Sequence, residues 1–288
     1  MSSTGRNRSE GWRHAKVDGH RNEHSFAAEL LENPLYLSQV EAFLSSKKIL
    51  GVPRAEVDGS KHVNSILGDF TTSKVDFALT WPSGEKINIS LKKSKTGQVW
   101  LISVNRFLSA IEYYTSAKVP EAVRAGISLF IGGTNIASYR DDYETALKRD
   151  HLTMPNIAKQ ESHQERLVAK SLELNLPNIW HPTLEFFNRN IELITKLSFS
   201  HGLVKSVADT ADLIIYNHKA RKPDIFQIEK IAKASSQEIQ ARPVVAGPLN
   251  GGSTLLLPTG RLQMHRPQGE NQLQFRHEFE KISSLPIY

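Results

Sequence analysis

The chain has no cysteine among its 288 residues. This absence excludes disulfides, thiol nucleophiles and cysteine-ligated zinc, and it favours a cytoplasmic location. No hydrophobic run approaches the roughly 18 apolar residues that a membrane-spanning helix needs. The first residues are polar and basic, without the apolar stretch of a secretion signal. We therefore expect neither a membrane protein nor a secreted one.

The residues that are present describe an ordinary globular protein with a basic excess. Hydrophobic residues make up 39% and charged residues 23% of the sequence, which is enough to bury a full core. Lys and Arg outnumber Asp and Glu by 36 to 30, which gives a net charge of +6. A basic excess favours a polyanionic partner such as nucleic acid, although many basic proteins never bind one.

The sequence divides into a flexible basic arm over residues 1–22 and one domain over residues 23–288. Hydrophobic spacing predicts helices near residues 23–31 and 106–114. Between them, a three-stranded meander is expected, and the resulting order indicates an α/β fold of mixed α+β type. The meander strands are expected at 75–81, 86–92 and 98–104, a loop-like stretch at 51–73, a short buried strand at 211–216, and a β-rich end after 244 with a last helix near 278–282.

The second strand of the meander carries a polar row. Side chains alternate along a strand, so Asn88, Ser90 and Lys92 share one face while the intervening aliphatic residues pack on a core. The preceding strand carries Asp76 near its start, and a tight turn joins the two strands. In an antiparallel hairpin, Asp76 then lies opposite Ser90 and Lys92. An acid, a hydroxyl and a lysine are thus expected to converge.

Phosphodiester hydrolysis requires such a set. A carboxylate, here Asp76, anchors a divalent metal that polarises the phosphate and activates a bound water. Lys92 beside the metal orients or deprotonates that water and offsets the charge of the transition state. Because one carboxylate holds Mg²⁺ weakly, a second is wanted, and we choose Glu23 at the start of the first helix.

These residues resemble the PD-(D/E)xK nuclease superfamily and, more narrowly, type II restriction endonucleases. In that superfamily an Asp on one strand faces an acid-x-Lys pair on the next, within an α-β-β-β-α-β core whose central mixed sheet is flanked by helices. Asp76 matches the first acid and Lys92 the lysine. Ser90 stands at the second acid position, as a hydroxyl variant. Gln98 is similar to a polar residue that such enzymes place near the site, and the resemblance covers about residues 19–115.

The resemblance implies Mg²⁺-dependent, site-specific hydrolysis of double-stranded DNA that leaves 5′-phosphate ends. It places a catalytic core at about residues 23–135 and recognition elements within 136–288. A homodimer on a symmetric site and a monomer that nicks the strands in turn both remain open. Basic and amide side chains supply the expected DNA contacts. They are Lys93, Lys95, Gln263, His265, Arg266, Gln274, Arg276 and His277.

Purely structural roles remain open for the same residues. Asp76 could form a structural ion pair with Lys74 or Lys92, and Glu23 could be an acid that stabilises a helix N-terminus. The C-terminal amide and basic residues could be ordinary polar surface. Two other functions are compatible with the residues. One is a repair or recombination nuclease that reads DNA structure, and the other is a non-catalytic DNA-binding protein, which the hydroxyl at Ser90 favours.

Overall fold

The structure is a computed structural model, and its described residues group into two compact units. The first unit comprises Met1–Ser65, Phe70–Ser94 and Phe199–Ile228, and the second comprises Ile66–Asp69, Lys95–Ser198 and Glu229–Tyr288. The described residues are 22–44, 51–57, 61–92, 98–132, 166–217, 222–266 and 271–287. The expected basic arm over residues 1–22 lies, except for its last residue, outside them.

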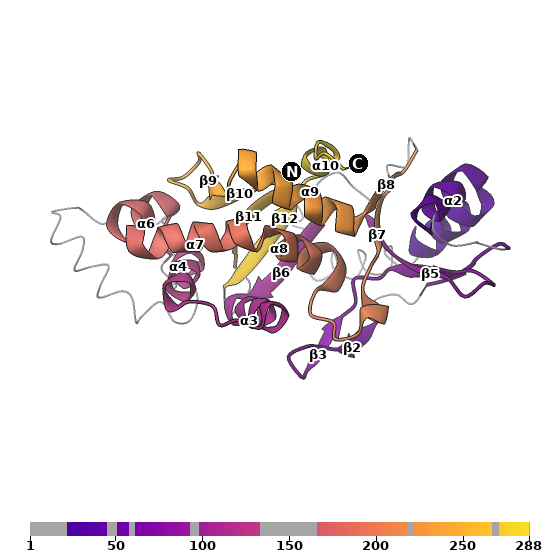
Figure 1. The fold of residues 1–288 in the computed structure, drawn as a ribbon, viewed down its shortest axis with the longest axis horizontal. Helices are drawn as coiled ribbons and strands as arrows, with labels where there is room; N and C mark the ends of the chain where they lie inside the picture. The colour runs from indigo at the N-terminus through magenta and orange to yellow at the C-terminus, as the bar shows by residue number, and fades with distance from the viewer. Residues whose placement is uncertain are drawn as a thin grey trace, which may run out of the picture. The chain divides into compact units, whose positions relative to one another are not determined.

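A five-stranded mixed sheet forms the centre of the first unit (Figure 1). Strand β5 pairs with β4 in the antiparallel sense and with β7 in the parallel sense, and the remaining neighbours are antiparallel. The strand order is β1 (Arg54–Glu56), β4 (Phe77–Thr80), β5 (Lys86–Lys92), β7 (Leu213–Tyr216) and β8 (Asp224–Gln227).

Two helices cover one face of this sheet. Residues 22–32 form the first, and α2 (Pro34–Glu41) follows after Asn33, whose side chain accepts hydrogen bonds from the first backbone N–H groups of α2. Phe26 meets Phe77 edge to face at 6.4 Å, and the aliphatic side chains of β5 join the same core. Because side chains alternate along a strand, the polar row of β5 lies on the opposite face of the sheet.

Short elements complete the first unit. Strands β2 (His62–Asn64) and β3 (Phe70–Thr72) form a separate two-stranded sheet. The expectation of a loop over residues 51–73 is therefore wrong, because this stretch holds three strands of three residues each. A strand of that length shows too little alternation for the sequence to reveal it. A short 3₁₀ helix, η3 (Val207–Asp209), precedes β7.

The second unit is built on an antiparallel five-stranded sheet. Its strand order is β6 (Gln98–Ser103), β12 (Gln272–His277), β11 (Gly260–His265), β10 (Thr254–Leu257) and β9 (Val245–Ala246). Its helices are α3 (Val104–Thr115), α4 (Glu121–Ile131), α6 (Ala169–Asn175), α7 (Pro177–Arg189), α8 (Ile191–Lys196), α9 (Ile228–Ala241) and α10 (Phe279–Ser283). Leu197–His201 is a π-helical turn that follows α8 directly.

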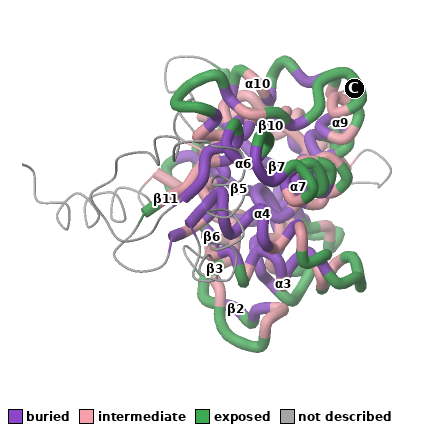
Figure 2. The backbone as a smooth tube through the Cα atoms, turned by 90° about the vertical axis from the view of Figure 1, so that its left-hand side faces the viewer, coloured by how far each residue is buried: buried purple, intermediate pink, exposed green. Residues whose placement is uncertain are grey.

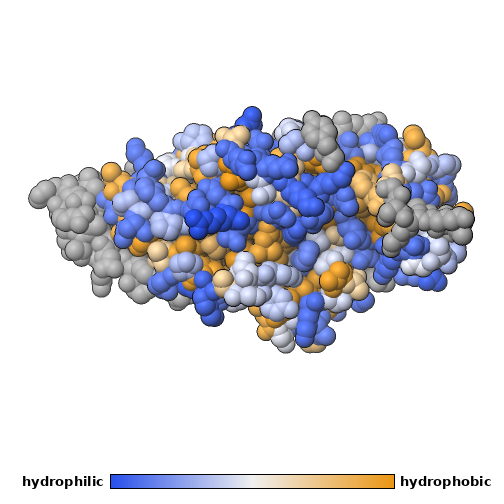
Figure 3. Space-filling model, in the orientation of Figure 1, coloured by the Kyte–Doolittle hydropathy of each residue, from blue (hydrophilic) through white to orange (hydrophobic). Residues whose placement is uncertain are grey.

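Aromatic packing joins this sheet to its helices. Phe107 of α3 contacts Trp100 of β6, Phe275 of β12 and Phe187 of α7, with ring centroids 5.4 to 6.4 Å apart. Figure 2 shows α3 and α7 on the same side of the strands β6 and β11. The outer faces of α7 and α9 are hydrophilic, as Figure 3 shows, so the apolar sides of the helices face inward.

The mixed α+β fold, with a central mixed sheet flanked by helices, is confirmed. Strand β5 spans the residues expected for it, and the buried strand near 211–216 and the last helix near 278–282 are present as β7 and α10. The three-stranded meander is wrong, because β6 pairs with β12 of the second sheet and β5 pairs with β7. Strand periodicity identifies a strand but does not identify its partner.

In the part of the chain that the structure describes, no helix is both long and apolar enough to cross a bilayer.

Candidate active site

The candidate site begins at Asp76, which immediately precedes β4 and lies opposite β5. The backbone N–H of Asp76 donates to the carbonyl of Ile89 at 2.8 Å, which continues the ladder of the β4–β5 hairpin by one residue. The Oδ2 atom of Asp76 accepts a hydrogen bond from the backbone N–H of Leu91 at 2.6 Å. Main-chain hydrogen bonds therefore hold both the backbone and the carboxylate of Asp76 against β5.

Two side chains of β5 meet the same carboxylate oxygen. The hydroxyl of Ser90 donates to Oδ2 of Asp76 at 3.2 Å, and Nζ of Lys92 lies 3.6 Å from it. The structure thus brings together the three residues that the sequence placed on facing strands. Solvent reaches the side chains of Asp76 (28% exposed) and Lys92 (23%), whereas Ser90 is 0% exposed. A ligand from solvent can therefore reach the acid and the lysine, while Ser90 contacts the acid from within.

Lys74 is a second lysine at this site. From the sequence it was expected only as a possible structural ion-pair partner of Asp76. Its half-buried stem passes Gly202, where an added Cβ would lie 3.2 Å from the Cε of Lys74. Burial and the nearby charge of Lys92 lower the pKa of Lys74 to about 7, although Asp76 opposes the shift. Its position two residues before Asp76 was the one sequence signal for it, since both residues precede β4.

Asn88 anchors the polar row of β5 to the segment before β7. Its side-chain amide donates to the carbonyls of Ala208 at 3.0 Å and Thr210 at 2.8 Å. Its backbone N–H donates to Oδ2 of Asp212 at 2.8 Å. Asp212 therefore has a structural role just before β7. These bonds hold the strand that carries Ser90 and Lys92.

A Mg²⁺ ion fits one end of this arrangement. Within the described ranges, the side-chain hydrogen bonds and the ion pair of Asp76 involve Oδ2, which leaves Oδ1 available as a ligand. Among the described residues, no three or more His, Asp or Glu side chains gather as a preformed metal cluster. Mg²⁺ commonly binds through one or two carboxylates while it keeps several waters or takes phosphate oxygens. The donor set is therefore compatible with a metal completed by water and substrate.

The other predicted catalytic residues lie further along the chain. Glu23 is half-buried in the first turn of the helix over residues 22–32, one turn before Phe26. Gln98 begins β6, which belongs to the second unit, so it does not extend the β4–β5 hairpin as expected. Its side chain, together with Lys93 and Lys95, lies outside the described residues.

The expected DNA-contacting residues of the C-terminal region lie on and beside two paired strands. Gln263 and His265 belong to β11, Gln274 and Arg276 to β12, and the exposed Arg266 follows β11. His277 is the exception. It is 1% exposed, and its Nδ1 forms a 2.8 Å hydrogen bond with Thr259. Alternation turns it toward the core of the second unit, so we withdraw it as a DNA contact.

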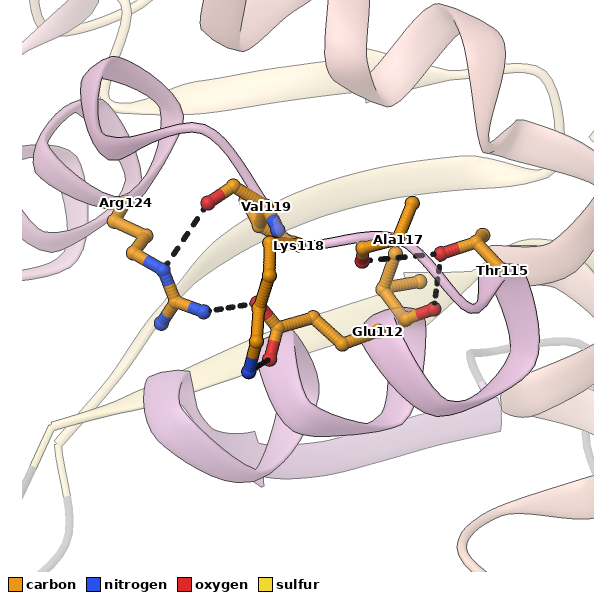
Figure 4. Close-up of polar contacts among 7 residues, drawn as sticks. Glu112, Thr115, Ala117, Lys118, Val119 and Arg124 are labelled. Atoms are coloured by element: carbon orange, nitrogen blue, oxygen red, sulfur yellow. Dashed lines mark hydrogen bonds and ion pairs between the residues drawn. The ribbon is translucent and has the colours of Figure 1, made fainter.

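A cavity of about 690 Å³ in the second unit is bounded by α3, α4 and α7. Figure 4 shows the polar contacts beside it, in which Glu112 accepts from Val119 N at 2.9 Å, from Lys118 at 3.3 Å and from Arg124. Burial alone would raise the pKa of Glu112, but these donors outweigh it and lower the pKa. The hydrogen bonds of Glu112 fix the loop between α3 and α4, so this carboxylate has a structural role. Because the cavity wall is also mostly apolar, this region does not suit phosphate chemistry. The apolar wall residues include Ile111, Val119, Pro120, Val123, Pro182 and Phe186.

Comparison with known proteins gives a distant structural likeness. No model of a protein family matches the chain, and no curated protein matches its sequence. Among solved structures, the crystal structure of restriction endonuclease MspI in complex with its cognate DNA is similar to this chain. The TM-score is 0.42 at 12% identity, and the match covers 86% of this chain and 82% of that one. At that distance the likeness assigns no function, so the functional argument depends on the residues themselves.

Proposed function

We propose that the chain is a Mg²⁺-dependent endonuclease that hydrolyses double-stranded DNA at a specific site and leaves 5′-phosphate ends, as type II restriction enzymes do. The observation that carries the proposal is the meeting of Ser90, Leu91 and Lys92 at one oxygen of Asp76. An acid with one free oxygen, next to a solvent-accessible ammonium, suits the hydrolysis of a phosphodiester.

Each residue has a distinct role in this mechanism. Oδ1 of Asp76 would hold Mg²⁺, which when bound polarises the scissile phosphate and lowers the pKa of a coordinated water. Lys92 orients the attacking water and offsets the negative charge that develops on the phosphate. Ser90 is a positioning residue, because it is buried and reaches the reaction only through Asp76. Lys74, whose pKa is lowered to about 7 by burial and by Lys92, would carry a second positive charge near Asp76 only below about that pH.

Glu23 remains our choice for a second acid. The helix that carries it packs through Phe26 onto Phe77, the residue after Asp76, so its first turn belongs to the same part of the first unit. We expect Glu23→Gln to raise the Mg²⁺ concentration needed for half-maximal cleavage by about tenfold, the size of effect that loss of a supporting group has on metal affinity. An unchanged Mg²⁺ requirement would remove Glu23 from the site.

A non-catalytic DNA-binding protein is the second candidate. One observation favours it, since Ser90 stands where the resembled enzymes carry a carboxylate, and its hydroxyl is buried. Such a protein would bind duplex DNA through its basic residues and leave it intact. A structure-selective repair nuclease would instead cut flaps or junctions and spare an intact plasmid.

Digestion of unmethylated phage DNA by the purified protein separates these candidates. The reaction is run with Mg²⁺ or with EDTA, and with the Lys92→Ala variant. Discrete fragments that require Mg²⁺ and disappear with the variant support a site-specific endonuclease. Uncut DNA that still shifts in a gel supports the DNA-binding protein. Cleavage of branched DNA alone supports the repair nuclease, and a homodimer is tested by sedimentation with and without cleavable DNA.

A further inference from the structure

The two strands β11 and β12 place a hydrogen-bonding surface on one side of the second sheet. Cross-strand partners share a face, so the paired positions combine into three rows. Arg261 pairs with Arg276, Gln263 with Gln274, and His265 with Gln272. We call these six side chains the β11–β12 face.

The opposite side of the same strands is the core of the second unit. Leu262, Leu273 and Phe275 are each 0% exposed, and Phe275 stacks on Trp100 with ring centroids 5.2 Å apart. All six residues of the β11–β12 face are instead partly exposed. Beside them on β6, Val99 (41% exposed) and Leu101 (39%) lie on the same side as Arg276 and Gln274. Solvent therefore reaches a continuous surface across three strands.

We infer that the β11–β12 face reads base edges in the major groove of double-stranded DNA. The choice of DNA rests on the proposed function, whereas the surface itself comes from the register of the strands. β11 and β12 are neighbouring strands inside the five-stranded sheet, between β10 and β6, and a major groove about 12 Å wide accommodates about two strands of it. Three rows two residues apart span about 14 Å, which corresponds to roughly four base pairs.

The charges of this surface suit DNA. It carries Arg261, Arg276 and His265. Among the described residues, Glu278 is the acid that contacts this surface, through an ion pair with Arg261 at 3.1 Å. Arg276 forms no ion pair with any residue in the described ranges, so its guanidinium is available to a ligand. An arginine without an ion pair in the described ranges, next to amides, suits contact with guanine, which accepts two hydrogen bonds from arginine.

The central row suits a different base. Nε2 of Gln263 donates to Oε1 of Gln274 across the two strands. The pair then retains an acceptor oxygen on Gln263 and a donor N–H on Gln274. Adenine offers the complementary N6 donor and N7 acceptor in the major groove. We therefore expect a preference for A·T at the central row and for G·C beside Arg276, with Val99 and Leu101 suited to a thymine methyl group.

Enrichment of bound sequences from a randomised 30-base-pair duplex pool tests the inference. The wild type, Gln263→Ala/Gln274→Ala and Arg276→Ala are compared in Ca²⁺ and in EDTA, without Mg²⁺. We expect the wild type to enrich a motif. The amide variant should lose the A·T preference, and Arg276→Ala the G·C preference, each by roughly 5- to 150-fold. Binding of random duplex, which depends on salt, should change little.

Matched controls come from α9 and the residues after it. Gln237→Ala/Gln240→Ala removes two exposed amides, and Arg242→Ala removes an arginine whose side chain is 85% exposed. Thermal unfolding checks that every variant is folded. If Gln263→Ala/Gln274→Ala is not folded, the conservative Gln263→Asn/Gln274→Asn replaces it. A motif that survives in both face variants overturns the inference, and so does a wild type that enriches no motif.

Plasmid cleavage in Mg²⁺, measured in parallel, separates this inference from the proposed function. A wild type that enriches a motif but cuts nothing contradicts the nuclease and leaves the reading surface supported. A wild type that cuts at a motif which the face variants still recognise contradicts the reading surface alone.

Discussion

The backbone N–H of Leu91 donates a 2.6 Å hydrogen bond to Oδ2 of Asp76. This bond holds the carboxylate against β5 independently of the side chains on that strand. The donor is a backbone N–H, which every non-proline residue at position 91 would supply. The bond also explains how the site keeps its geometry with Ser90 at the position where an acid would be expected. The hydroxyl adds a second donor to the same oxygen and leaves Oδ1 for other ligands.

Lys92→Ala is expected to slow Mg²⁺-dependent cleavage by about 10²- to 10⁴-fold, the usual contribution of a positioned proton-transferring group. Its ammonium lies 3.6 Å from Asp76, so the variant would remove a cation from the proposed position of the reacting phosphate. Single-turnover kinetics on a plasmid measure the rate. Lys86→Ala, at the exposed start of the same strand, is the matched control. Equal rates for the two variants would exclude Lys92 from the chemistry.

Ser90→Ala is expected to slow cleavage by roughly tenfold, which corresponds to the loss of one hydrogen bond to a charged group. Because Ser90 acts through Asp76, the variant should also change the Mg²⁺ concentration needed for half-maximal rate. Ser90→Thr keeps the hydroxyl on a strand residue and should restore both values. A Thr variant that behaves like Ala, with an unchanged Mg²⁺ requirement, would show that Ser90 only fills space.

The lowered pKa of Lys74 predicts that the free energy of unfolding depends on pH. Its pKa falls from 10.5 to about 7 in the folded protein because of burial and the charge of Lys92. Below about pH 7, Lys74 is charged in both states, so folding bears the full cost of the half-buried charge. As the pH rises toward 10.5 the folded state releases the proton first, and the cost disappears. Lys74→Met should therefore stabilise the protein at pH 6 and have little effect near pH 10.5.

Urea unfolding of the wild type and Lys74→Met at the two pH values measures this difference in the free energy of unfolding. Mg²⁺ is left out so that no bound metal changes the charge around Asp76. Lys61→Met, on a lysine whose side chain is 55% exposed, is the control for removing a surface lysine. A stabilisation of the same size at both pH values, or a loss of stability at pH 6, would contradict the burial of Lys74 next to Lys92.

Asn88→Ala is expected to lower the free energy of unfolding by about 1–3 kcal/mol. The substitution leaves the carbonyls of Ala208 and Thr210 without their side-chain donor, and buried groups that lose a partner carry such a cost. Chemical denaturation gives the value. Asn64→Ala, on the exposed side of β2 in the same unit, serves as the reference. A cost no greater than that of Asn64→Ala would contradict the anchoring role.

The local part of the site was predictable from the sequence. Alternation over β5 places Asn88, Ser90 and Lys92 on one face, and the short turn after β4 brings Asp76 opposite them. Both signals act over a few residues, so they do not depend on how the rest of the chain folds. Lys74 escaped this reasoning because it lies outside both strands, two residues before Asp76.

The long-range part was not predictable in the same way. The second neighbour of β5 is β7, which pairs Lys92 with Tyr216 across more than a hundred residues of chain. Nothing in the periodicity of β6 distinguishes pairing with β5 from its actual pairing with β12. The burial of His277 follows from that pairing, since the register of β12 decides which of its side chains face the core.

Asp76→Asn is the most direct test of the proposed active site, because the substitution keeps the shape of the side chain and removes the charge that would hold Mg²⁺. The measurement is the rate of Mg²⁺-dependent cleavage of unmethylated phage DNA by the wild type and the variant. Asp209→Asn, which removes another acid of the first unit, is the control. We predict cleavage by the wild type and the control, and a loss of at least about a hundredfold for Asp76→Asn. Cleavage by Asp76→Asn at the wild-type rate would contradict an active site at Asp76.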